Sequence, residues 1–242
     1  MQAIRTVGLV KRYKNIIAVD GLNLEIMDGE LFSLLGVNGA GKTTTIKMLS
    51  CLTAPTEGDA LVGGYSIIKE PEKVKRIIGV SPQETAIAPG LTVKENLELI
   101  SGIYGFSKEA TRKKLARLTE QLDLGDILDR KAGKLSGGWQ RRVSIAMALI
   151  SEPTILFLDE PTLGLDVLAR RELWEIIKAL KGKVTVILTT HYMEEAEALS
   201  DRIGIMKGGA LLAVGTADEL KAKTGALDFE SAFVSIVKEG EI

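Results

Sequence analysis

Short apolar runs recur along the chain, and most are continuous rather than alternating with polar residues. They occupy residues 31–35, 77–80, 155–158, 184–190 and 203–206. A strand with one face in water alternates apolar and polar residues, whereas a continuously apolar strand is buried on both faces. Such strands are typical of a parallel sheet that helices cover on both sides.

Helical periodicity appears next to several of these runs, at the spacing of β–α units. The segments are 43–52, 167–180 and 193–199, and Gly182 is placed to end the second. The sequence therefore predicts an α/β core with a mostly parallel sheet.

The middle of the chain, about residues 88–152, has helical periodicity and no strand pattern of its own. Thr92 and Glu95 have the spacing of a capping box, and Ser107 suits the N-cap of a second helix. The expected helices are 93–104, one that follows Ser107, and 139–150. We therefore expect a helical subdomain inserted into the α/β core.

Both ends of the chain have strand patterns. Residues 6–10 and 16–26 lie between turn residues and predict short strands, which would form an N-terminal antiparallel β-subdomain. A strand over 210–214, a capping box at Thr216 and Glu219, and a helix over 229–237 are expected near the C-terminus. We thus divide the chain into one domain, residues 1–224, and a short helical tail, residues 225–242.

Charge and composition narrow the choice of function. The 242 residues contain 31 Lys and Arg against 32 Asp and Glu, which argues against a sequence-blind nucleic-acid binder. Cys51 is the only cysteine, so an internal disulfide or a Cys-based zinc site is not expected. The sequence has neither a signal peptide nor a stretch long and apolar enough to span a membrane. We expect a cytoplasmic chain, and any membrane-spanning part would belong to another protein.

A phosphate-binding loop follows the first apolar run directly. The sequence Gly36-Val37-Asn38-Gly39-Ala40-Gly41-Lys42-Thr43 is a complete P-loop between a predicted strand and a predicted helix. Glycines let successive N–H groups point inward, Lys42 can reach the β- and γ-phosphates, and Thr43 offers a hydroxyl to Mg²⁺.

Polar residues also follow two other predicted strands. Asp159 and Glu160 come after the run 155–158, and His191, the only histidine, comes after the run 184–190. Ligands bind at the carboxyl ends of the strands in such sheets, so these side chains are expected on the phosphate side. Asp159 could hold Mg²⁺, and Glu160 could activate a water for attack on the γ-phosphorus.

A second anion-binding nest is expected far from the first in sequence. Ser136, Gly137 and Gly138 open the predicted helix 139–150, where backbone N–H groups can meet an anion. One chain thus has two phosphate-type nests.

This combination of motifs resembles the nucleotide-binding subunit of ABC transporters over essentially the whole chain. Leu135-Ser136-Gly137-Gly138 is similar to the LSGGQ signature of that family, but the fifth residue is Trp139 and Gln140 follows it. The Ser136 hydroxyl and the Gly138 N–H are kept. The resemblance makes Tyr13 the aromatic residue that stacks on adenine, Gln83 the glutamine that touches Mg²⁺ and the attacking water, and His191 the histidine that contacts the γ-phosphate.

The resemblance implies a P-loop NTPase that binds ATP and Mg²⁺ and hydrolyses ATP. The residues expected to contact nucleotide are Tyr13, Gly36, Asn38, Gly39, Ala40, Gly41, Lys42, Thr43, Thr44, Ser136 and Gly138. Those expected in catalysis are Glu160, His191, Gln83 and Lys42, and those expected at the metal are Thr43, Gln83 and Asp159.

The implied partners are a second ATP-binding subunit, identical or similar, and an integral membrane permease on whose cytoplasmic face the chain would sit. The stretch 91–105 is most similar to bacterial exporter ATPases for drugs, lipids, polysaccharides or ions. An ABC-type ATPase head that acts on DNA or ribosomes is the main alternative, and a small-molecule kinase is another. Coiled-coil insertions or zinc-binding cysteines would favour the DNA-associated class, and this sequence has neither and lacks net basic charge. A ribosome-associated protein of this kind would normally hold two such domains in one chain.

Overall fold

A computed structural model describes residues 1–239 of the chain. The strands are β1 Gln2–Tyr13, β2 Ile16–Leu22, β3 Glu25–Met27, β4 Leu31–Leu35, β5 Glu57–Val62, β6 Tyr65–Ser66, β7 Ile78–Ser81, β8 Ile155–Asp159, β9 Thr185–Thr190, β10 Arg202–Lys207 and β11 Ala210–Gly215. The α-helices are α1 Lys42–Leu49, α2 Pro71–Ile77, α3 Val93–Ile103, α4 Lys108–Gln121, α5 Gly137–Leu149, α6 Val167–Lys178, α7 Met193–Leu199, α8 Ala217–Thr224 and α9 Phe229–Glu239. Two short 3₁₀ helices, Gly125–Ile127 and Ala132–Lys134, precede α5.

The central sheet has the strand order β11-β10-β4-β9-β8-β7. All neighbours pair in parallel except β10 and β11, which are antiparallel. The predicted α/β fold with a mostly parallel core sheet is therefore confirmed, and each of the five apolar runs matches one of these strands to within one residue at each end.

Alternate residues of the central strands enter two different hydrophobic clusters. In β8, Leu156 and Leu158 pack with α5 and α6, whereas Ile155 and Phe157 pack with α1 and the β-subdomain. Every residue of β4, β8 and β9 is buried. The runs are continuously apolar because both faces of the sheet are covered.

The N-terminal strands form a second, antiparallel sheet, as expected, but it is larger than the sequence predicted. Its order is β2-β1-β5-β6, and β3 pairs with β1. β1 is one long strand with register shifts rather than the short strand predicted over 6–10. β5, β6 and the intervening turn at Gly63 and Gly64 were not predicted.

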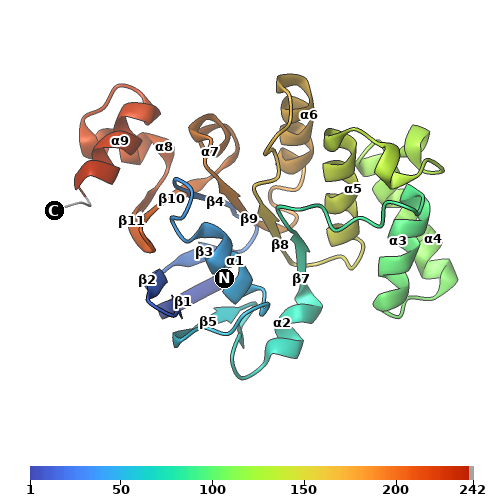
Figure 1. Cartoon of the computed structure of the whole chain (residues 1–242), viewed down its shortest axis with the longest axis horizontal. Helices are drawn as coiled ribbons and strands as arrows, with labels where there is room; N and C mark the ends of the chain where they lie inside the picture. Colours follow the sequence, from blue (N-terminus) through green and yellow to red (C-terminus); the bar gives the residue numbers. More distant parts are fainter. Residues whose placement is uncertain (240–242) are drawn as a thin grey trace.

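The three predicted helices of the middle segment are α3, α4 and α5, and they stand together at one end of the molecule (Figure 1). The capping box is confirmed, since the Thr92 hydroxyl accepts from Glu95 N and the Glu95 carboxylate accepts from Thr92 N. Ser107 accepts from Ala110 N at the start of α4. α5 begins at Gly137, two residues earlier than predicted.

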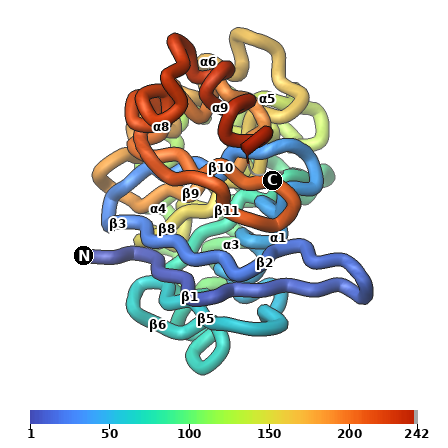
Figure 2. The backbone as a smooth tube through the Cα atoms, turned by 90° about the vertical axis from the view of Figure 1, so that its left-hand side faces the viewer, coloured from blue at the N-terminus to red at the C-terminus, as the bar shows by residue number. Residues whose placement is uncertain are grey.

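The helices α8 and α9 lie on the side of β10 and β11 away from the β1–β2 hairpin (Figure 2). Phe229, Phe233 and Ile236 of α9 pack with Ile203 and Ile205 of β10. The described part of the expected tail thus shares a hydrophobic cluster with the core sheet. Its last residues, 240–242, lie outside the described residues.

A buried polar pair joins α6 to α7. Trp174 Nε1 donates to Glu195 Oε1 at 3.0 Å, and both side chains are buried. Burial raises the pKa of the Glu195 carboxyl, while hydrogen bonds from Thr190, Thr162 and Trp174 oppose the increase. The folded protein therefore holds the Glu195 proton more tightly than the unfolded chain does.

We expect Glu195→Gln to flatten part of the dependence of stability on pH. Because the pKa of Glu195 is raised on folding, its protonated form stabilises the fold fully below the unfolded value of about 4.3, and this contribution is lost as pH rises through the folded pKa. Gln keeps the acceptor for Trp174 and does not ionise. Urea unfolding from pH 4.5 to 8 should show the variant gaining on the wild type by up to about 1.4 kcal/mol per pH unit within that window. Parallel profiles of the two proteins would contradict the assignment.

Candidate functional site

The loop between β4 and α1 has a conformation that only glycine accommodates at its final residue. Gly41 has φ of 101°, and a Cβ there would lie 2.4 Å from the Ala18 carbonyl oxygen of β2. Gly39 also has a left-handed φ, of 81°. The loop can therefore curl tightly ahead of α1, as a phosphate-binding loop must.

Lys42 is the first residue of α1, and its ammonium group is buried inside the loop. Its Nζ donates to the carbonyl oxygens of Gly36 at 2.7 Å and Val37 at 3.2 Å, and lies 3.5 Å from Glu160 Oε1. Burial lowers the pKa of Lys42, and the Glu160 carboxylate opposes this effect. A buried cation inside a curled loop of backbone N–H groups is well suited to bind phosphate.

Asp159 ends β8 beside the same loop. Its Oδ1 accepts from Thr43 Oγ1 at 3.0 Å and from Thr189 Oγ1 at 2.5 Å. Thr43 and Asp159 were both predicted at the metal, and the structure places them in contact. Their hydroxyl and carboxylate oxygens are the ligands that Mg²⁺ prefers.

Glu160 lies between a cation and the histidine. Its Oε1 faces Lys42, and its Oε2 lies 3.2 Å from His191 Nδ1. The residue has a φ of 46°, and its backbone N–H donates to the carbonyl and hydroxyl oxygens of Thr189. The carboxylate is thus held at a fixed place on the carboxyl edge of the sheet.

Tyr13 and Gln83 were predicted from the resemblance alone, and the structure places both on the surface. Tyr13 ends β1, is 45% exposed, and has Lys11 Nζ 5.0 Å from its ring. It belongs to the β1–β2 hairpin, whose Ala18 contacts the P-loop glycine. Gln83 follows β7, two residues beyond the end of that strand, and is exposed.

The second nest opens α5. Ser136 is the N-cap residue, but its side chain makes no capping hydrogen bond and is exposed. A Cβ at Gly138 would lie 3.0 Å from the Ala169 Cβ of α6. Within residues 1–239, no hydrogen bond joins Ser136 or Gly138 to the P-loop of the same chain. The small cavity beside Ser136 and Gly138 is lined by residues of α5 and α6 and by none of the P-loop, so the two nests lie at different places on the chain.

Thr189 is a site residue that the sequence analysis did not single out. Its hydroxyl group donates to Asp159 and accepts from Glu160 N. The available signal was a polar pair, Thr189 and Thr190, at the end of an otherwise apolar run. In a strand buried on both faces, such hydroxyls need partners, and the acidic residues on the next strand provide one.

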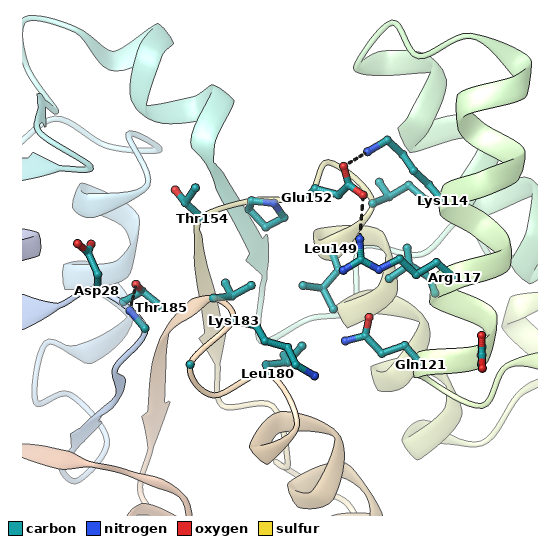
Figure 3. Close-up of a pocket in the computed structure, with 17 residues that line it drawn as sticks. Asp28, Lys114, Arg117, Gln121, Leu149, Glu152, Thr154, Leu180, Lys183 and Thr185 are labelled. Atoms are coloured by element: carbon teal, nitrogen blue, oxygen red, sulfur yellow. Dashed lines mark hydrogen bonds and ion pairs between the residues drawn. The ribbon is translucent and has the colours of Figure 1, made fainter. Parts of the chain in front are cut away.

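A cavity of about 880 Å³ lies away from all the predicted site residues (Figure 3). It lies between α4 and the segments that precede β8 and β9, where Glu152 pairs with Lys114 and Arg117. These are the amino ends of the strands. Because phosphate groups bind at the carboxyl ends in such sheets, this cavity is not the candidate nucleotide site.

The comparisons with known proteins agree with the fold and with the site. The profile of the family described as ABC transporter matches residues 19–163. The chain belongs to the ABC transporter family and is an ATP-binding subunit of that family.

It is similar to the daunorubicin/doxorubicin resistance ATP-binding protein DrrA of Streptomyces peucetius, with 44% identity over 93% of this chain and 68% of DrrA. A solved structure of the ATP-binding subunit of an ABC transporter superposes with a TM-score of 0.85 at 30% identity, covering 97% of this chain and 99% of the other. The ATP-binding cassette MJ0796, in a dimeric post-hydrolysis state with ADP and Pi, gives a TM-score of 0.79 at 31% identity over 88% and 98% of the two chains.

Among residues 1–239, every helix is too short or too polar to cross a bilayer.

We expect Lys42→Ala to weaken binding of ATP by about 10- to 100-fold, because a charge-assisted hydrogen bond to phosphate is lost. Isothermal titration calorimetry measures the affinity directly. Lys47→Ala is a matched control, since Lys47 lies on the same helix but is exposed. Equal affinities of the two variants would remove Lys42 from the site.

Proposed function

We propose that this chain hydrolyses MgATP and that two ATP-binding subunits close on ATP to drive a separate membrane permease, in the direction of export. The observation that carries the proposal is the convergence of Lys42, Asp159, Glu160 and His191 at one edge of the sheet. Lys42 supplies a cation for the phosphates, and Asp159 supplies a carboxylate for a metal ion. Glu160, in contact with His191, supplies a general base. Phosphoryl transfer to water requires these parts.

The residues present fit ATP and Mg²⁺. The curled loop with Lys42 suits the phosphates, and Thr43 with Asp159 supplies hard oxygen ligands beside it. When bound, Mg²⁺ would neutralise charge on the phosphate oxygens. Tyr13, on the hairpin that contacts the P-loop, is proposed to stack on adenine, and Gln83 to reach the metal and the attacking water.

Glu160 is proposed as the general base. Its carboxylate is buried and faces Lys42 with one oxygen and His191 with the other. Phosphate oxygens in the loop would compete with Glu160 for the Lys42 ammonium, and that competition would free one carboxylate oxygen to orient water. His191 would hold the second oxygen and face the γ-phosphate.

The separation of the two nests supports a dimer. One ATP cannot contact both nests of a single chain, but two chains related by a two-fold axis can each present Ser136 and Gly138 to the nucleotide held by the other. The exposed Ser136 hydroxyl, free of capping, is compatible with this role. One relative is named for drug resistance, one solved relative is the ATP-binding subunit of an ABC transporter, and another is dimeric, so the DNA- or ribosome-associated alternative is not favoured.

We expect Glu160→Gln to bind ATP and to slow hydrolysis by about 10² to 10⁴-fold, since a general base is lost. Removing a negative charge beside the γ-phosphate should also stabilise the closed dimer. The variant should run as a dimer in size-exclusion chromatography with MgATP and as a monomer with ADP.

Adding Ser136→Arg to Glu160→Gln should restore the monomer with MgATP, because the long side chain would fill the nest. Lys134→Arg in the same background is the control, since Lys134 is exposed and lies just before the nest. A monomeric Glu160→Gln variant with bound MgATP, or a dimeric double variant, would contradict the composite site.

A surface groove next to Gln83 is the proposed permease contact. It has a volume of about 400 Å³ and a mainly apolar lining that includes Pro82, Ala86, Ile103 and Tyr104. Ile103 is 71% exposed at the end of α3. An apolar groove beside a proposed catalytic segment suits a short helix of a permease, which would hold the chain at the cytoplasmic face of the membrane.

Photo-crosslinkers at Ala86 or Ile103 should capture one integral membrane protein in native membranes, identified by mass spectrometry. A crosslinker at Lys183 is the control, because Lys183 lines the separate cavity of Figure 3. Equal capture from Lys183, or none from Ala86 and Ile103, would place the permease contact elsewhere.

A further inference from the structure

Arg141 is a buried arginine of α5 with two backbone partners. Its Nη1 donates to the Pro82 carbonyl at 2.6 Å and its Nη2 to the Gln83 carbonyl at 2.5 Å. The residue is 5% exposed, and among residues 1–239 no carboxylate lies within ion-pair distance of it. Burial lowers the pKa of Arg141, and the charge of Asp159 opposes this effect.

Burying a guanidinium without a carboxylate partner destabilises the fold, and its two hydrogen bonds to carbonyl groups offset part of this cost. The planar fork of arginine suits two acceptors at once, which a lysine ammonium does not match. Here the acceptors are the consecutive carbonyls of Pro82 and Gln83, just after β7. Residues 83–88, which form neither helix nor strand, are called the Gln83 segment below.

Arg141 belongs to a face of α5 that runs along β7. Ser144 Oγ lies 2.9 Å from Ser81 Oγ, and a Cβ on Gly79 would lie 2.3 Å from the Ala148 carbonyl. Positions 141, 144 and 148 have the spacing of a single helix face. The packing of α5 against β7 therefore continues beyond the strand to the Gln83 backbone, and Arg141 makes the contact there.

The neighbouring Arg142 has different partners. Its guanidinium lies 4.2 Å from the Trp139 ring centroid and 2.9 Å from Glu172 Oε2 of α6. Of these two adjacent buried arginines, Arg141 joins α5 to the backbone after β7, whereas Arg142 joins α5 to α6. This gives Arg142 the properties of a matched control.

We propose that Arg141 is a positioning residue that ties the nest at the start of α5 to the backbone that presents Gln83. The inference rests on the proposed function, because it assumes that Ser136 and Gly138 meet one nucleotide while Gln83 serves the other. α5 begins four residues before Arg141, so a displacement of the nest moves the fork and the two carbonyls with it. Engagement of the partner's nucleotide would in this way set the place of Gln83.

A double-mutant cycle tests the link. Arg141→Met should lower kcat for ATP about tenfold while the Kd for ATP changes less than about twofold, since the P-loop is untouched. In a Gln83→Ala background, Arg141→Met should cause almost no additional loss, because its effect runs through Gln83. Arg141→Lys should restore part of kcat. A merely structural role would give additive losses, and additivity would overturn the proposal.

Arg142→Met removes a buried arginine from the same helix and should combine additively with Gln83→Ala. Hydrogen–deuterium exchange provides a readout that does not need hydrolysis: Arg141→Met should increase exchange in residues 83–88 and leave residues 36–49 unchanged, whereas Arg142→Met should not affect residues 83–88. Unchanged exchange in residues 83–88 of Arg141→Met would overturn the proposal.

Different results would contradict the proposed function and the proposed role of Arg141. A wild-type chain that binds no ATP or does not hydrolyse it, alone or with its permease, would contradict the proposed function, while the exchange experiment would still decide whether Arg141 holds the Gln83 segment. If Arg141→Met does not fold, Arg141→Lys and Arg141→Gln enter the same cycle and the same exchange measurement.

Discussion

The site depends on the parallel pairing of β4, β9 and β8. The register aligns Leu35 with Thr190 and Asp159 with Thr189, so the P-loop, the acidic pair and His191 leave the sheet at one edge. Alternate residues of these strands enter different hydrophobic clusters. A shift of the pairing by one residue would turn each side chain to the opposite face of the sheet, where it would meet the wrong cluster. Burial on both faces therefore fixes the register, and the register places the polar side chains.

That placement buries two opposite charges, Lys42 and Glu160, at the carboxyl edge of the central sheet. Lys42 and Glu160 lie 3.5 Å apart with almost no exposure, and each reduces the cost of burying the other. A phosphate bound in the loop would compete with Glu160 for the same ammonium group. In the proposed function, the arrival of an anion at Lys42 would thus free one oxygen of the Glu160 carboxylate, while the other oxygen stays 3.2 Å from His191 Nδ1.

A sequence pattern predicts structure well where it has one physical cause. Continuous apolar runs predicted the buried strands, and the P-loop spacing predicted the curled glycine loop ahead of α1. β5 was missed because it begins with exposed or half-buried Glu, Gly and Asp, a pattern that also fits a loop, and β6 was missed because it has only two residues. Arg141 was missed for a related reason: a charged residue on a helix is normally solvated, and only the packing of α5 against β7 shows that it is buried.

The packing of α5 also explains how separate nests can act together. Its nine residues from Arg141 to Leu149 are all buried, which is unusual for a helix with two arginines. Close packing along this stretch leaves little space for the helix to bend locally, which favours movement of α5 as a body. One arginine holds it to the Gln83 backbone and the other to α6, which follows Asp159 and Glu160 along the chain. Through these two contacts, a displacement of α5 would reach both the Gln83 backbone and α6.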